Sequence, residues 1–433
     1  MADSHAVSTN GTTTRDEVAW LARRAAWGLR PGQLDELEAL GTDAVIDLLV
    51  DPEANGIAAE PSPWSDFEYL DDQESRQRQV VDVLSSWVDH LVMTDRPYEN
   101  TLAWFWHDHF AVSYAVVNYL PTFLAHLDLL RSSATGDFRE LIRDVTTDGA
   151  MLIFLDGTTS TGESPNENFG RELLELYTLG IGNYTEDDVR AAAVALTGWV
   201  VARRFDWEVF FVEDRHDATP QTFLGTSGVS GADAVVDTAV SHAAVPGFIA
   251  GKMASHFLGA VDSATVASLA DTFAANDLTI GPLSRAVLEA GVSGACSPQV
   301  TAPLPWTVAA LKATGATPPV RPMLNLLRQM GQVPGVPPNV GGYPGASTWL
   351  ASSATAGRFT AANAIARLTP AGAPALEAAA ARDYDELADI LLRPEGFSAP
   401  TIAALDDLAG SAAPRPGEAV LAVALSSPDF LIR

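Results

Sequence analysis

Apolar residues recur at spacings of three and four along most of the chain, which is the periodicity of one face of an α-helix. Near the N-terminus Val18, Leu21 and Ala25 fall on one face, and Gly28 ends that segment. A second helix is predicted to begin close to Pro31, because proline is tolerated in the first helical turn. The same spacing returns in "VVDVLSSWVDHLVM" and in "LPTFLAHLDLL". The pattern predicts an all-α fold, a large irregular multi-helix domain.

Two segments depart from the helical pattern. In residues 200–225, β-branched and aromatic residues alternate with charged ones, which predicts a short β-hairpin or an irregular insertion. The Pro/Gly-rich segment 331–349 predicts a long loop that wraps the surface. Residues 1–14 are small and polar, so we predict a disordered tail there. Residues 15–433 would then form a single domain, with a candidate sub-boundary near 293–303.

The charge balance and the cysteine count restrict the classes of function. The net charge is −29, and Lys252 and Lys312 are the only lysines. An acidic surface repels phosphate backbones and anionic lipid, which argues against nucleic-acid or membrane-surface binding. Cys296 is the only cysteine, so neither an intramolecular disulfide nor a cysteine-based zinc cluster can form. No apolar run is long enough to span a membrane and no signal peptide is seen, so a cytoplasmic location is expected.

The highest density of polar side chains lies in the segment "NENFGRELLELYTLG", residues 166–180. On an α-helix five of these side chains fall within an arc of about 140°, opposite an apolar side; they are Glu167, Asn168, Arg171, Glu172 and Glu175. One interpretation is a solvated face with ordinary ion pairs four residues apart. The other is a working site. Gly170, on the apolar side, would let a second helix pack very close.

The working-site interpretation assigns roles to these residues. Glu172 and Glu175 are three apart, so their carboxylates can converge for metal binding or for acid–base catalysis. Asp156, at the end of "LIFLDG", is a third candidate catalytic residue, with a turn-forming aspartate as the alternative. The candidate substrate-binding residues lie at the start of the same helix; they are Asn166, Glu167, Asn168 and Arg171.

Histidines supply the candidate metal ligands. His107 and His109 in "FWHDHF" point about 200° apart on a helix, so they cannot both reach one ion. We expect His109 to point inward and His107 to point away, and we prefer His109 as a ligand. The adjacent pair His216 and Asp217 resembles the His–Asp doublet of metal-dependent phosphohydrolases. For each of these residues the alternative is an ordinary packing or loop role.

Several motifs occur in a fixed order, namely "WFWHDHF", "LIFLDG", "PNENFGRELLELYTLG", "YTEDDV", "LTGW", "HD" and "GQVPGVPPNVGGYPG". Together they resemble the bacterial family catalogued as domain of unknown function 1800, from about residue 17 to the C-terminus. The family has no established activity, and many members look exported, often through a twin-arginine leader. Members are often encoded beside a second, sulfatase-like family, which implies a protein partner. The family commonly has histidine where this chain has Tyr177, which weakens the expectation of a metal.

Two functions of different classes follow from the residues. The first is a hydrolase, metal-assisted or carboxylate-dependent, that acts on a polar or anionic substrate, with a divalent metal ion as the candidate cofactor. The second is a non-catalytic helical scaffold or accessory protein that works with a protein partner. The sequence has no Walker loop, no G-x-G-x-x-G after a strand and no G-x-S-x-G elbow. Nucleotide binding by these loops and α/β-hydrolase chemistry are therefore disfavoured.

Overall fold

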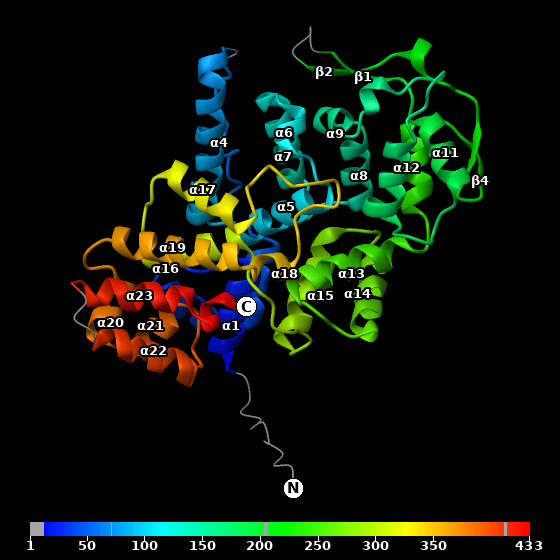
Figure 1. Ribbon diagram of the computed structural model, residues 1–433. Coiled ribbons are helices and arrows are strands. Elements are labelled where there is room, and N and C mark those ends of the chain that lie inside the picture. The colour runs from blue at the N-terminus through cyan, green and yellow to red at the C-terminus, as the bar shows by residue number, and fades with distance from the viewer. Residues whose placement is uncertain (1–12, 71, 203–206, 411–413) are drawn as a thin grey trace.

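The computed structural model describes residues 13–433 except 71, 203–206 and 411–413. Most of the predicted tail therefore lies outside the described residues. The last two residues of that predicted tail, 13 and 14, are ordered: Thr13 caps α1 (Thr14–Ala25) in a capping box with Asp16, and Thr14 begins the helix. Within the described residues the chain forms 24 α-helices and two small antiparallel strand pairs (Figure 1), which confirms the predicted all-α fold.

The N-terminal part of the fold is built around one buried helix, α5 (Pro97–His109), in which nine of 13 residues are buried. Aromatic residues dominate it, and Trp104 and Trp106 are 3% and 0% exposed. A helix buried on all sides occupies the centre of a fold. Its neighbours in the chain are α2 (Gln33–Leu40), α3 (Thr42–Val50), α4 (Gln73–Met93), α6 (Tyr114–Val117), α7 (Leu120–Ser132), α8 (Phe138–Thr146) and α9 (Gly149–Phe154).

The middle of the chain contains the β insertion. The predicted hairpin is two hairpins, β1 (Trp199–Ala202) with β2 (Glu208–Phe211) and β3 (Gln221–Phe223) with β4 (Thr226–Val229). Thr185 caps α11 (Glu186–Ala195) in a capping box with Asp188. The remaining elements are η1 (Gly157–Thr159), α10 (Glu167–Glu172), the π-helix η2 (Leu173–Thr178), η3 (Glu213–Arg215), α12 (Ala232–Val240), α13 (Val245–Phe257), α14 (Ser263–Ala275) and α15 (Ile280–Val292).

The C-terminal helices fold back onto the start of the chain. They are α16 (Pro303–Thr314), α17 (Val320–Met330), α18 (Ala346–Trp349), α19 (Ser352–Leu368), α20 (Pro374–Ala381), α21 (Tyr384–Ile390), α22 (Ala399–Ala409), α23 (Pro416–Ser426) and α24 (Pro428–Leu431). The segment predicted as a sub-boundary pairs with the chain end, since Gln299 and Arg433 exchange two backbone hydrogen bonds of 2.9 Å. Figure 1 shows the C-terminus beside α1.

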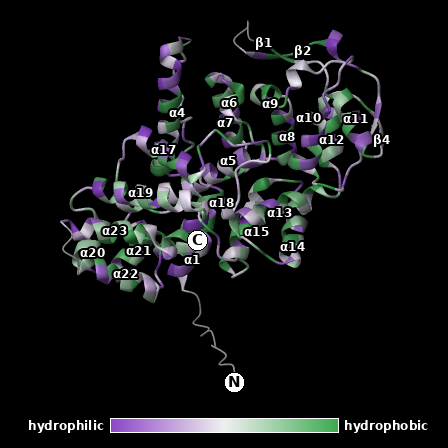
Figure 2. Cartoon of the chain, in the orientation of Figure 1, coloured by the Kyte–Doolittle hydropathy of each residue, from purple (hydrophilic) through white to green (hydrophobic). Residues whose placement is uncertain are grey.

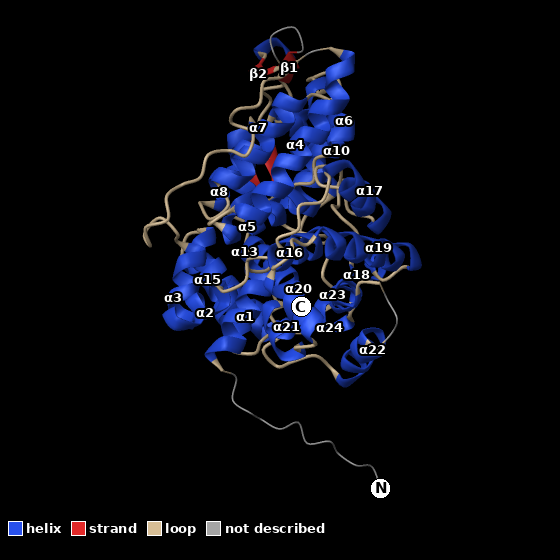
Figure 3. Cartoon of the chain, turned by 90° about the vertical axis from the view of Figure 1, so that its left-hand side faces the viewer, coloured by secondary structure: helices blue, strands red, loops and turns tan. Residues whose placement is uncertain are grey.

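One hydrophobic cluster runs from α1 to α23. Most helices carry both hydrophobic and hydrophilic residues in Figure 2, as amphipathic helices do. Figures 1 and 3 agree that the β1–β2 hairpin lies at one end of the molecule and α1 at the other. No single described helix is long and apolar enough to cross a membrane; α12 and α13 meet the length and composition criteria only together, with a bend of 76° between them.

The Pro/Gly-rich segment 331–349 is irregular as predicted until α18, but the prediction that it wraps the surface is wrong for its middle. The Tyr343 ring stacks on Trp104 with 5.1 Å between centroids, and its hydroxyl donates to the Val333 carbonyl at 2.6 Å. The Tyr343 amide donates to a carboxylate oxygen of Asp108 at 2.6 Å. These contacts replace the hydrogen bonds to water that a surface loop would make, so the segment can pack onto α5.

Candidate functional site

The polar segment starts as the predicted α-helix but does not continue as one. After α10 ends at Glu172, the chain forms the π-helix η2, in which the Thr178 hydroxyl donates to the Leu173 carbonyl at 2.6 Å. A π turn inserts one extra residue and is common at functional sites. The expectation that the whole polar segment lies on one α-helix is therefore wrong in its second half. The insertion changes the direction in which Glu175 and the residues after it point.

Gly170 lets α10 lie against α11, as the sequence indicated. A Cβ atom at this position would stand 2.9 Å from the Val189 carbonyl oxygen and 3.2 Å from the Ala192 Cβ. The close approach brings the two helix surfaces into register, so Arg171 faces Glu186 across the interface. Their side chains make two parallel hydrogen bonds of 2.7 Å, a bidentate ion pair.

The candidate site itself is the carboxylate pair Glu172 and Glu175. Both side chains are half-buried. Burial and the neighbouring charge of Glu175 raise the pKa of Glu172 above its ordinary value. Glu175 accepts a hydrogen bond of 2.5 Å from the hydroxyl of Tyr184, which comes from the loop after the π turn. The structure thus places two carboxylates in mutual electrostatic contact but in different environments.

The predicted substrate-binding residues divide into two groups. Asn166 caps α10 by accepting from the Asn168 amide at 2.9 Å, and its own amide donates to the Leu155 carbonyl at 2.7 Å. Asn166 and Arg171 therefore have structural partners. Glu167 and Asn168 are exposed beside the carboxylate pair, and Glu167 lies 4.0 Å from the Arg171 guanidinium. These two side chains remain available to a ligand.

Asp156 does not join the carboxylate pair through any contact in the described structure. It is exposed and has a φ of 56°, in the left-handed region that aspartate tolerates better than most residues. Its backbone carbonyl accepts hydrogen bonds from the Thr159 amide at 3.2 Å and from the Thr159 hydroxyl at 2.9 Å. This geometry is that of a turn residue, the alternative that the sequence left open.

The four predicted metal ligands lie in three separate environments, because only His216 and Asp217 are neighbours. His107 is fully buried among the rings of Trp87, Trp104, Phe123 and Tyr343. The expectation that it points away from the core is wrong, because α5 is enclosed on all sides. Burial lowers its pKa to about 3.

His109 lies on another side of α5, with its Nε2 atom 3.1 Å from the Tyr177 carbonyl oxygen. His216 bonds the Thr197 carbonyl through Nδ1 at 3.0 Å, and Asp217 accepts from the Thr219 amide at 2.9 Å. Among the described residues, no group of three or more His, Cys, Asp or Glu side chains is placed to hold a metal ion.

Two charged residues under the π turn were not singled out from the sequence. Lys252 of α13 donates to the Leu176 carbonyl at 3.1 Å, beside the Tyr177 carbonyl that His109 contacts. Burial lowers the pKa of Lys252, and the charge of Asp108 opposes that shift. Burial raises the pKa of Asp108 to about 6. The available signal was that Lys252 is one of only two lysines in a chain with 26 Lys and Arg residues.

The raised pKa of Asp108 gives a stability prediction. From pH 3.8 to about 6 the unfolded chain ionises Asp108 while the folded protein keeps it protonated, so folding stability is lost as the pH rises. Asp108→Asn retains an acceptor for the Tyr343 amide and removes the titration. We expect the free energy of unfolding of the wild type to fall by about 2–3 kcal/mol relative to Asp108→Asn between pH 4 and about 7. Urea unfolding of both proteins at several pH values measures this difference. A difference in the free energy of unfolding that does not change with pH would contradict the prediction.

The loops that carry the other motifs hold the start of α10. The Gly162 amide donates to the Arg215 carbonyl at 2.9 Å, and the Arg215 guanidinium donates to the Thr158 carbonyl at 3.0 Å. The Asp217 amide donates to the Thr197 hydroxyl at 2.9 Å. These hydrogen bonds join three segments to one another, namely "LTGW", "HD" and the loop before "PNENFG". His216 and Asp217 act in this arrangement as parts of the support.

A family model described as "Protein of unknown function (DUF1800)" matches residues 20–432. The chain belongs to this family. The match covers nearly the whole described structure, so α10, the π turn and the Asp108–Lys252 region all lie within the DUF1800 domain. No curated protein and no solved structure matches the chain significantly.

Proposed function

We propose that this DUF1800 protein is a carboxylate-dependent hydrolase that cleaves glycosidic bonds. The observation that carries the proposal is the pair Glu172 and Glu175 on the π turn, in which burial and a like charge raise the pKa of Glu172. A raised pKa favours the protonated form of a carboxyl group, which is the form that a general acid needs in order to donate a proton.

In this mechanism Glu172 gives its proton to the glycosidic oxygen as the bond between that oxygen and the anomeric carbon breaks. Glu175 acts as the second carboxylate, a base for water or a nucleophile, as in glycosidases with two carboxylates. The Tyr184 hydroxyl fixes the position of Glu175 through its 2.5 Å hydrogen bond. Water supplies the hydroxyl group of one product and the proton that restores the acid.

The sequence predicts a polar or an anionic substrate. The surroundings of Glu172 and Glu175 favour a polar substrate without charge. Glu167 and Glu186 lie nearby, and the charge of Arg171 is already paired with Glu186. The whole chain carries −29. A negative potential of this kind repels anions. The exposed side chains of Glu167 and Asn168 could hydrogen-bond the hydroxyl groups of a neutral sugar.

The metal-assisted alternative receives no support from the residue placement. Glu172 and Glu175 have no described third ligand, and the candidate histidines lie in other environments. The mechanism proposed for Glu172 and Glu175 therefore uses no metal ion.

The alternative of a non-catalytic scaffold with a protein partner stays a prediction. Exposed apolar side chains favour it, namely Ile181, which is 81% exposed just after the π turn, and Phe210 and Phe211 on β2. Solvent-exposed apolar side chains of this size are enriched at protein interfaces only when they gather in a patch. Ile181 and the two phenylalanines belong to separate elements, so we place this function second.

The proposal is tested with purified protein and a panel of neutral oligosaccharides and aryl glycosides. We expect the wild type to release reducing ends from at least one of them, and the double variant Glu172→Gln/Glu175→Gln to release none. Glu36→Gln, an exposed site on α2, controls for loss of one negative charge. A wild type inactive on the whole panel, or a double variant as active as the wild type, contradicts the proposal.

A further inference from the structure

A second feature, unrelated to the π turn, is a cavity of about 490 Å³ between α1, α2, α3 and the chain after α4. Its size falls in the range of small-molecule sites. The walls are mostly apolar; among the lining residues are Val18, Leu29, Leu37, Val45, Leu49 and Ile57. Three charged side chains also line it, Lys312 from α16, Arg30 from the loop after α1 and Asp95 from the chain after α4.

Lys312 is the unusual member of this lining. It is 6% exposed, and its ammonium group donates to the Ala26 carbonyl at 2.8 Å. An ammonium group has three donors, and this is its one hydrogen bond among the described residues. No carboxylate in the described part of the chain makes an ion pair with it. A buried charge without a counter-charge is costly, and burial together with Arg30 lowers the pKa of Lys312 to about 7.

Arg30 does not supply the missing counter-charge, since it is a cation itself. It is tied to the rim of the cavity, where it donates to the Met93 carbonyl at 3.2 Å and to Asp95 at 3.3 Å. The charge of Arg30 is thus paired with Asp95, and among the described lining residues the cavity combines apolar walls with one unpaired cation, Lys312. The ligand chemistry that complements both is an anionic head group on an apolar chain.

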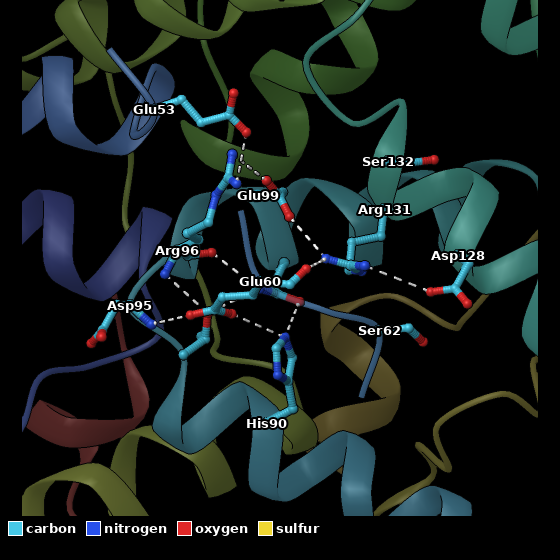
Figure 4. A network of polar contacts seen from close by, with 12 residues as sticks. Glu53, Glu60, Ser62, His90, Asp95, Arg96, Glu99, Asp128, Arg131 and Ser132 are labelled. Atoms are coloured by element: carbon cyan, nitrogen blue, oxygen red, sulfur yellow. Dashed lines mark hydrogen bonds and ion pairs between the residues drawn. The ribbon is translucent and has the colours of Figure 1, made fainter. Parts of the chain in front are cut away.

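The loop 51–60 forms one wall of the cavity, with Gly56, Ile57 and Ala58 lining the space. Both ends of this wall are fixed by the polar network in Figure 4. Glu53 pairs with Arg96 at 3.1 Å. Glu60 accepts hydrogen bonds from the Thr94 hydroxyl at 2.7 Å and from the Asp95 amide at 2.8 Å.

The network continues into the protein interior. Arg96 also pairs with Glu99 at 2.8 Å, and Arg131 donates to Glu99 at 3.3 Å. Figure 4 shows Arg96, which precedes α5, together with Glu99 of α5 and Arg131 of α7 around Glu60 of the loop. A loop anchored at both ends by charge-assisted hydrogen bonds keeps its position without a ligand. The cavity is thus a preformed space, which reduces the entropic cost of binding.

We propose that this cavity binds an amphipathic monocarboxylate, with the carboxylate at Lys312 and the alkyl chain against the aliphatic wall. The ligand supplies the counter-charge that Lys312 lacks, and its chain fills space that would otherwise expose apolar surface to water. This inference is independent of the hydrolase proposal, because it uses none of the residues of the π turn.

Isothermal titration calorimetry with decanoate and 1-decanol tests the proposal. The wild type should bind decanoate saturably, and Lys312→Met should weaken that binding at least about tenfold, since a hydrogen bond to a charged group is lost. Lys312→Met should bind 1-decanol within about twofold of the wild type, because the apolar walls are unchanged. Lys252→Met, which removes the only other lysine, is the matched control and should bind decanoate like the wild type.

Absence of saturable decanoate binding to the wild type overturns the proposal, and so does equal affinity of the wild type and Lys312→Met. If Lys312→Met does not fold, Leu37→Trp gives a second test. Leu37 is half-buried at the cavity wall, so the larger ring can enter the space from the side of α2. This variant should lose binding of both ligands, and retained decanoate binding contradicts the assignment of the cavity.

Discussion

Replacing Glu172 by glutamine is expected to slow cleavage of an unactivated glycosidic bond by about 10²–10⁴-fold, the usual contribution of a positioned general acid. Glutamine keeps the shape of the side chain but has no proton to give. Glu172 is half-buried and makes no ion pair within the described structure, so the variant should fold normally. Steady-state rates of reducing-end release, with far-ultraviolet circular dichroism to confirm the fold, measure the effect.

Glu36→Gln is again the control, because it removes the same charge from an exposed position on α2. Its rate should match that of the wild type. If Glu172→Gln retains the full rate on an unactivated substrate, Glu172 is not the proton donor. The pair with Glu175 would then be part of a solvated helix face, the other interpretation that the sequence allowed.

Replacing Arg24 by leucine is expected to lower the free energy of unfolding by about 3–5 kcal/mol. Arg24 on α1 is 1% exposed. Its guanidinium donates to the carbonyls of Phe257 at 3.0 Å, Ser297 at 2.6 Å and Arg433 at 2.6 Å, and to the side chain of Gln299. Leucine would leave these buried acceptors without donors.

Arg24 joins the first helix to the end of α13 and to the C-terminus, so the loss affects segments far apart in the sequence. Urea unfolding monitored by tryptophan fluorescence gives the change. Arg190→Leu is the control, since Arg190 is 55% exposed and its one ion pair among the described residues is with Asp187 at the surface of α11. That variant should change stability by less than about 0.5 kcal/mol. Equal stability of both variants would show that the Arg24 hydrogen bonds contribute little.

The helical architecture was predictable because it depends on local periodicity. The cap at Thr185 and the close approach at Gly170 are also local signals, and the structure has both. The π turn at 173–178 has no such signal, because α and π turns share residue preferences and differ in tertiary contacts. In this chain those contacts come from Lys252 and His109, which bond successive carbonyls of the turn.

The candidate site could be predicted only in part for the same reason. The spacing of Glu172 and Glu175 was visible in the sequence, since they share a helix. Tyr184 lies in the following loop, and its hydrogen bond to Glu175 could not be predicted from the sequence. Asp108 and Lys252 are 144 residues apart in the sequence. Their charges interact because α5 and α13 pack near each other in the fold. The histidines were candidate ligands because of their residue type alone. In the structure His107 and His109 are buried in the core, and His216 bonds the Thr197 carbonyl.

The most direct measurement of the central claim is the dependence of the Glu172→Gln defect on the leaving group. A nitrophenolate departs without a proton, whereas a sugar alcohol needs one, so only the second requires a general acid. We predict a large loss of rate on an unactivated disaccharide and a small loss on the matching nitrophenyl glycoside. Equal losses on both substrates would contradict the assignment of Glu172 as the proton donor.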